Sequence, residues 1–279
     1  MIFTSTSCLK NPQNIITVLD EYEKEGIENV ELGSVHNFFD LEQLKNYDFN
    51  YMIHGYFPPP KIPFNFNLAS QNKSISEKST TLAKNAIDLC CKLNSSFFTF
   101  HAGFTTDPPQ LGVRFPRKNI IDRKLALEIF FENTRIILDY AKTRGIQLAM
   151  ELNVIQKFNL DDGKNNLGLF VDYDEIELFY KNFKKDEIGI LLDLAHTIVT
   201  SHWLEFNKDE FITKLLDKIS VVHVSNNNGL QDQNLALTND CWPVTKLKLF
   251  RNKPITLESM NLNIEEIKSN IEIIRNAMK

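Results

Sequence analysis

The sequence predicts a (β/α)8 TIM barrel, an α/β fold, and three observations support this prediction. Eight short apolar segments alternate with longer segments of helical periodicity along the 279 residues, a pattern typical of βαβ units. The apolar segments are hydrophobic on both faces, as parallel strands covered by helices are. No Gly-rich nucleotide-binding motif follows any segment, which removes the usual reason for a doubly wound open sheet, the alternative topology. We therefore expect one barrel domain over residues 1–279.

Each predicted element is read from its hydrophobic pattern. The strands expected from apolar runs are Ile2–Thr6, Asn29–Leu32, Tyr51–Gly55, Phe97–His101, Gln147–Leu152, Ile188–Asp193, Ile219–Val224 and Pro254–Glu258. The helices expected from amphipathic spacing are Asn14–Glu25, Leu41–Asn46, Ser76–Leu93, Arg123–Arg144, Asp174–Phe183, Lys208–Leu216 and Ile264–Met278. Long loops follow the third, fourth and seventh strands, at the strand ends where barrel enzymes carry their chemistry.

Composition and charge narrow the classes of function. With 43% hydrophobic and 24% charged residues, the chain has enough apolar side chains for a large core. It lacks the roughly 18 consecutive apolar residues of a membrane helix and the pattern of a signal peptide. The four cysteines form neither a zinc framework nor a disulfide pattern, so we expect a cytoplasmic protein. A net charge of −5 gives no general attraction for nucleic acid.

Side chains able to bind metal end six of the eight predicted strands. They are His54, His101, Glu151, Asp193, His223 and Glu258. The carboxyl ends of barrel strands meet at one mouth, and an uncompensated buried charge there is unfavourable by several kcal/mol. Because few cations lie among these residues, bound divalent metal satisfies them most simply. The sequence thus predicts a metal site of Glu151, Asp193, His223 and Glu258.

Several of the histidines and basic residues also have a purely structural interpretation. A single strand-end histidine, such as His54 or His101, is more commonly a hydrogen-bonded structural residue than a ligand. His36 and His202 lie outside the strand-end pattern, and we assign both to the surface or to ordinary packing. The basic stretch Arg114–Lys118 is interpreted as a solvated loop face rather than an anion site.

On these strand ends the chain resembles the xylose isomerase-like superfamily, which holds sugar isomerases, epimerases and endonuclease IV. The resemblance covers essentially the whole chain, strand for strand. Ketose 3-epimerase-like members hold one metal with Glu, Asp, His and Glu from the last four strands, which implies that role for Glu151, Asp193, His223 and Glu258. It also implies that Glu151 and Glu258 are the acid/base pair acting through a metal-stabilised enediolate.

The resemblance to endonuclease IV implies a wider site. It adds His54, His101 of a His-x-Gly motif, His196 of an Asp-x-x-His motif, and Asp232 of an Asp-x-His motif. In this sequence Asn234 stands where that last motif has histidine, and an amide oxygen is a much poorer ligand than imidazole. The cofactor implied is therefore one divalent ion (Mn, Zn, Mg, Co or Fe), with two or three ions left open.

Three functions remain open at this point. The first is a metal-dependent isomerase or epimerase of a sugar or sugar phosphate, which the Asn-rich loop after the seventh strand suits because amides donate and accept hydrogen bonds. The second is an endonuclease IV-like hydrolase of phosphoesters, disfavoured by the acidic charge balance. The third is a non-catalytic metal- or sugar-binding barrel. A carbohydrate is the expected partner, nucleic acid is less favoured, and a homo-oligomer is left open. The predicted substrate-binding residues are Glu31, Asn153, Asn226 and Asn234, and Glu31, at the end of the second strand, could orient either a ligand or a substrate hydroxyl.

Overall fold

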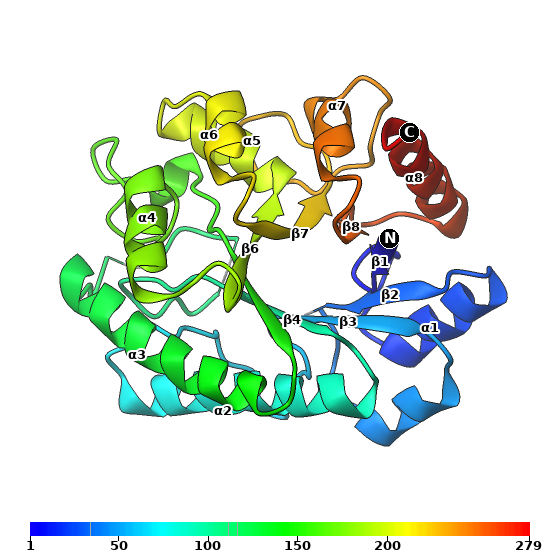
Figure 1. Ribbon diagram of the computed structural model, residues 1–279, viewed down its shortest axis with the longest axis horizontal. Helices are drawn as coiled ribbons and strands as arrows, with labels where there is room; N and C mark the ends of the chain where they lie inside the picture. The colour runs from blue at the N-terminus through cyan, green and yellow to red at the C-terminus, as the bar shows by residue number, and fades with distance from the viewer. Residues whose placement is uncertain (34, 111, 116) are drawn as a thin grey trace.

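In the computed structural model, eight parallel strands close into a barrel in sequence order (Figure 1). The structure describes residues 1–33, 35–110, 112–115 and 117–279. The strands are β1 (Ile2–Ser5), β2 (Asn29–Leu32), β3 (Asn50–His54), β4 (Phe97–His101), β5 (Gln147–Glu151), β6 (Ile188–Asp193), β7 (Ile219–Val224) and β8 (Ile255–Leu257). Strand β8 pairs in parallel with β1, Thr4 lying beside Leu257, which closes the ring. The predicted barrel is confirmed.

Helices surround the strands on the outside of the barrel (Figure 1). The α-helices are α1 (Ile15–Lys24), α2 (Lys73–Lys92), α3 (Arg123–Lys142), α4 (Tyr173–Asn182), α5 (Leu194–Trp203), α6 (Lys208–Leu215), α7 (Trp242–Lys246) and α8 (Ile264–Ala277). The 3-10 helices are η1 (Leu41–Asn46), η2 (Lys157–Asn159) and η3 (Leu247–Phe250). Helices α1, α2, α6 and α8 begin after an Asn whose side chain accepts a backbone N–H, a favoured cap. No helix in the described ranges is long and apolar enough to span a bilayer.

Helix α5 is the main element that the sequence pattern does not predict. It starts directly after β6, and Asp193 is both the last residue of the strand and the cap of the helix. Its Oδ1 accepts a hydrogen bond of 2.9 Å from the backbone N–H of His196. The apolar run that follows Asp193 continues the strand pattern without a turn signal, so the boundary is not visible in the sequence. The helix places His196 one turn beyond Asp193.

The inside of the barrel changes from apolar to polar along the strands. Near the N-terminal ends an apolar layer fills it, made of Phe3, Met52, Ala149, Leu191 and Val221. Side chains two positions apart on a strand share a face, so the next inward residues on β3, β5, β6 and β7 point to the C-terminal mouth. Those residues are His54, Glu151, Asp193 and His223. The strand alternation therefore places the predicted ligands above a closed apolar floor.

His36 lies in a buried packing position beside the barrel. It is 7% exposed, its Nε2 is 2.7 Å from Thr6 Oγ1, and its ring meets Phe57 edge to face. Burial lowers the pKa of His36 to about 4, although the Pro12 carbonyl opposes the shift. His36 therefore has the ordinary packing role assigned to it. His202 is exposed, in agreement with its assignment to the surface.

The buried neutral His36 predicts a loss of stability in mild acid. As pH falls below the unfolded pKa of about 6.5, the unfolded chain binds a proton that the folded chain does not, so the free energy of unfolding falls until pH reaches the folded value. We expect this group to contribute about 2 kcal/mol of lost stability between pH 7.5 and pH 5. Urea unfolding of wild type and His36→Asn at both pH values measures it. An equal pH-dependent loss in both proteins would contradict the assignment.

Candidate metal centre

The side chains predicted at the strand ends lie together at the C-terminal mouth of the barrel. Their potential ligand atoms form four sets of three, and within each set the atoms lie within 4.8 Å of one another. The sets are Glu31, His54 and His223; His54, His101 and Glu151; Glu151, Asp193 and His196; and Asp193, His223 and Glu258. The structure thus brings together all six strand-end residues, with His196 from α5 and Glu31 from β2.

Glu151 lies at the centre of the histidines. Its Oε2 is 3.1 Å from His101 Nδ1 and 3.3 Å from His54 Nε2, and its Oε1 is 3.2 Å from His196 Nδ1. Nevertheless, Glu151 Oε2 and His196 Nδ1 are buried and have no hydrogen-bond partner among the described residues. Buried polar atoms are nearly always paired. Close approach without hydrogen-bond geometry is the arrangement expected of atoms that share a cation.

Asp193, His223 and Glu258 form the second part of the site. His223 Nδ1 lies 2.9 Å from Glu258 Oε2, and Asp193 Oδ2 is buried without a hydrogen-bond partner in the described part of the chain. Burial raises the pKa of Asp193 to about 7; His196 opposes the shift, and Glu258 and Glu151 add to it. These carboxylates therefore repel one another unless a positive charge lies between them.

The donor set fits a divalent metal. Atoms without a hydrogen-bond partner in the described ranges include Glu31 Oε1, Glu151 Oε2, Asp193 Oδ2, His196 Nδ1 and Asp232 Oδ1. Imidazole nitrogens with carboxylate oxygens are a ligand set that suits Zn, Mn, Fe and Co. Asp193 belongs both to the set with Glu151 and to the set with His223 and Glu258, so these four residues would share one ion around Asp193, and His54 and His101 lie where they could share Glu151 with a second.

Two of the remaining predicted residues lie in the loop after β7. Asp232 Oδ2 is 3.3 Å from His196 Nε2, so Asp232 adjoins the site through this histidine. Asn234, at the position of the expected histidine, accepts a hydrogen bond at its Oδ1 from Ser225 Oγ, 3.1 Å away. Asn234 has a left-handed backbone, with φ of 48°. This amide is thus held by its own loop.

The other residues predicted to bind substrate also make internal contacts. Asn153 Nδ2 donates to the carbonyls of Gly103 and Leu169, which ties neighbouring loops together. The backbone of Asn226 bridges to Leu235, and its Oδ1 accepts from the N–H of the next residue. Glu31 is 0% exposed. Substrate binding by these side chains stays a prediction, and the contacts give each of them a structural role.

Arg117 is not part of a solvated loop face, contrary to expectation. It pairs with Asp161 at 3.2 Å and donates to the carbonyls of Asn159 and Leu160. Only 22% of its side chain is exposed. The sequence pattern could not identify these partners, because they lie more than 40 positions further along the chain.

Tyr56 is a residue at the site that the sequence analysis did not select. It follows β3 in the left-handed conformation, with φ of 72°, which is uncommon for a bulky residue. Its ring centroid lies 5.0 Å from that of His101, and its buried hydroxyl has no partner among the residues described. Burial raises the pKa of this hydroxyl. The feature of the sequence that could have identified Tyr56 as a site residue is its position two residues after His54, at the end of a strand.

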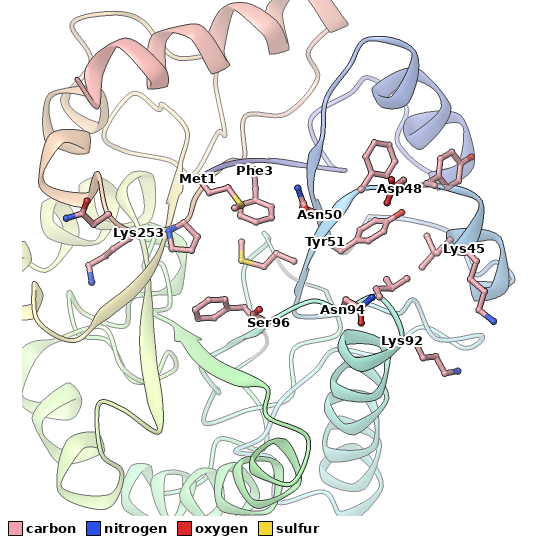
Figure 2. Close-up of a pocket in the computed structure, with 18 residues that line it drawn as sticks. Met1, Phe3, Lys45, Asp48, Asn50, Tyr51, Lys92, Asn94, Ser96 and Lys253 are labelled. Atoms are coloured by element: carbon pink, nitrogen blue, oxygen red, sulfur yellow. The ribbon is translucent and has the colours of Figure 1, made fainter.

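A cavity of about 660 Å³ lies at the opposite end of the barrel from these residues (Figure 2). It is lined by the starts of β1, β3 and β4, including Phe3 and Tyr51, with Lys45 and Lys92 beyond them on one side and Lys253 on another. None of the predicted site residues lines it. Because barrel enzymes carry their chemistry at the C-terminal face, this cavity is not the candidate site.

Comparisons with known proteins agree with the fold. Residues 41–275 match a family model described as "Xylose isomerase-like TIM barrel". The uncharacterized protein MJ1614 of Methanocaldococcus jannaschii is 21% identical over 95% of this chain and 94% of its own length.

Two solved structures have the same architecture. A D-tagatose 3-epimerase-like protein superposes with a TM-score of 0.72 at 18% identity, covering 99% of this chain and 96% of that one. D-psicose 3-epimerase of Clostridium cellulolyticum H10, solved with D-tagatose, gives a TM-score of 0.68 at 12% identity, covering 100% and 99%. At these identities the likeness establishes the fold.

Proposed function

Since the chain belongs to the xylose isomerase-like TIM barrel family, we propose that it is a divalent-metal-dependent isomerase or epimerase of a sugar or sugar phosphate. The observation that carries the proposal is a pair of carboxylates at the mouth, the buried Glu151 at the end of β5 and the partly buried Glu258 directly after β8, with Asp193 and His223 on the strands between them. The structural neighbours that are named as sugar epimerases support the substrate class.

The two glutamates have the placement that proton transfer at carbon requires. They stand on strands three positions apart in a ring of eight, so they approach a ligand at the mouth from different sides. Burial opposes ionisation of Glu151, but His101 and His196 outweigh it and lower its pKa. One glutamate, ionised at neutral pH, would accept the proton beside the sugar carbonyl, and the other, carrying a proton taken up from solvent, would deliver that proton to the opposite face.

A bound divalent metal supplies Lewis-acid stabilisation of the negative charge that develops on the sugar oxygens. The residues that would hold it are Glu151, Asp193, His223 and Glu258. Above the apolar floor of the barrel, Asp193 and His223 would also help to orient a ligand between the two glutamates. Tyr56, from the loop after β3, packs against His101, with the two ring centroids 5.0 Å apart.

One observation favours a second candidate, a metal-dependent phosphoester hydrolase of the endonuclease IV type. Glu151 belongs to two ligand sets at once, one with His54 and His101 and the other with Asp193 and His196. A carboxylate shared in this way suits two neighbouring ions, and paired metals are common in phosphoester hydrolysis. Asn234 in place of histidine and the net charge of −5 weigh against it.

A paired assay separates the two candidates. Purified protein with Mn²⁺ or Zn²⁺ is incubated with a panel of ketoses in D2O, and exchange of the proton next to the carbonyl is followed by NMR. In parallel it is incubated with a duplex that contains an abasic site. If the proposal is right, the protein should catalyse EDTA-sensitive exchange and should not nick the duplex. The control variant His202→Asn, at an exposed position, should behave as wild type. EDTA-sensitive nicking without exchange would establish the hydrolase. Neither activity would leave a non-catalytic barrel.

A further inference from the structure

We propose that Glu31 positions His223, holding Nε2 of the imidazole ring so that Nδ1 faces Asp193 and Glu258. The inference deepens the proposed function and rests on it only in requiring that the mouth of the barrel binds metal. It gives Glu31 a task different from contact with substrate. The residue acts through His223, from the opposite side of the ring.

The contacts on Glu31 define this arrangement. Glu31 Oε2 lies 3.0 Å from His223 Nε2 and accepts a second hydrogen bond of 3.0 Å from Thr256 Oγ1. Glu31, His223 and Thr256 are all 0% exposed. On the other edge of the ring, His223 Nδ1 is 2.9 Å from Glu258 Oε2. The Nε2 edge of the imidazole is therefore held by a carboxylate from β2, and its Nδ1 edge faces the candidate metal ligands.

The hydrogen bond at Nε2 matters because it determines which nitrogen of the imidazole can bind metal. A neutral ring carries its proton on one nitrogen and its lone pair on the other, and the hydrogen bond made by the first decides which is free for metal. Glu258 Oε2 lies equally close to Nδ1, so it is when a cation shared with Glu258 replaces the proton on Nδ1 that Glu31 on Nε2 selects the form with the proton on Nε2. The lone pair is then on Nδ1, on the side where Asp193 Oδ2 is buried without a hydrogen-bond partner in the described ranges.

Burial argues against direct contact between Glu31 and a substrate. A carboxylate with no exposed surface is not reached from the mouth unless His54 or His223 moves, since these two rings lie beside it, 4.9 Å apart between centroids. The set Glu31, His54 and His223 is also close enough to hold an ion. In that arrangement Glu31 would be a ligand, which the experiment distinguishes by the number of metals bound.

The test measures metal binding in the full chain. Zn²⁺ and Co²⁺ are titrated into wild type, Glu31→Gln and Thr256→Val, with stoichiometry and dissociation constants from chelator competition and the Co²⁺ absorption spectrum as a coordination signature. Glu31→Gln should bind the same number of ions about 10- to 100-fold more weakly, the range found for partners of ligating histidines, with a changed spectrum. Thr256→Val, which keeps the carboxylate but loosens it, should weaken binding by a smaller factor.

A matched control and separate outcomes keep the result interpretable. Glu175→Gln removes another largely buried carboxylate, one that pairs with Arg123, and should leave metal affinity unchanged. Fewer ions bound by Glu31→Gln would make Glu31 a ligand and overturn the proposal, as would unchanged affinity. If Glu31→Gln fails to fold, wild-type affinity in Thr256→Val overturns it. Nitrogen NMR of the Zn²⁺-loaded wild type gives a further check, because a proton found on Nδ1 of His223 would also overturn the proposal. A wild type that binds no metal would instead defeat the proposed function.

Discussion

Glu151→Gln is expected to reduce turnover at least about 1000-fold while leaving the barrel folded. General acid–base catalysis by a positioned side chain contributes about 10²- to 10⁴-fold, and the same substitution weakens metal binding, because the charge shared by His54, His101 and His196 is removed. Gln has nearly the same size as Glu, so the packing around this side chain, which is 1% exposed, is preserved. Steady-state kinetics on the ketose found in the exchange assay measures the loss.

A second variant, also compared at saturating metal, tests the other half of the proposed acid/base pair. Glu258→Gln leaves the three histidines around Glu151 in place, and it should also abolish epimerisation. It should still allow wash-in of solvent deuterium at the carbon if Glu151 is the base for the form supplied. Circular dichroism establishes that both variants are folded. Glu151→Gln with more than a tenth of wild-type turnover at saturating metal would exclude Glu151 from the proposed role.

Most of the fold was predictable because the strand pattern is local. Eight apolar runs separated by amphipathic segments define the barrel, and β2, β4, β6 and β7 have the predicted bounds. Helix α5 was missed because Asp193 ends β6 and caps the helix with no intervening residue. The segment Leu41–Asn46 was expected as a helix and forms the 3-10 helix η1. Errors thus occur where one residue serves two elements or where a segment is only one or two turns long.

The sequence predicts which residues form the site better than it predicts which of them contact one another. Strand alternation, with a polar residue at or next to the end of the strand, identifies His54, Glu151, Asp193 and His223 without any structure. The contact between Glu31 and His223 joins residues 192 positions apart, and it depends on β8 bringing Thr256 against the same carboxylate. The left-handed backbone of Tyr56 depends on packing in the loop after β3. Such relations follow from closure of the barrel, which local sequence does not encode.

Removing divalent metal is expected to lower the thermal midpoint of the protein by about 10 °C. An ion present at about 1000 times its dissociation constant stabilises the folded state by about 4 kcal/mol, and each kcal/mol shifts the midpoint of a protein of this size by about 2–4 °C. Only the folded chain brings Glu151, Asp193 and Glu258 together. Calorimetry at pH 8, with saturating Zn²⁺ or Mn²⁺ and then with EDTA, measures the shift. At that pH, above its pKa of about 7, Asp193 is ionised.

Asp193→Asn provides the decisive control, because its effect should depend on whether metal is present. Asn keeps the cap of α5, since its amide oxygen accepts from the N–H of His196 as Asp193 Oδ1 does. It removes one of several mutually repelling buried charges. The variant should therefore melt at or above wild type in EDTA and gain little from added metal, so the order of the two proteins reverses when metal is added. A variant that melts far below wild type in EDTA would mean that Asp193 stabilises the empty barrel, and the repulsion that motivates the metal site would be absent.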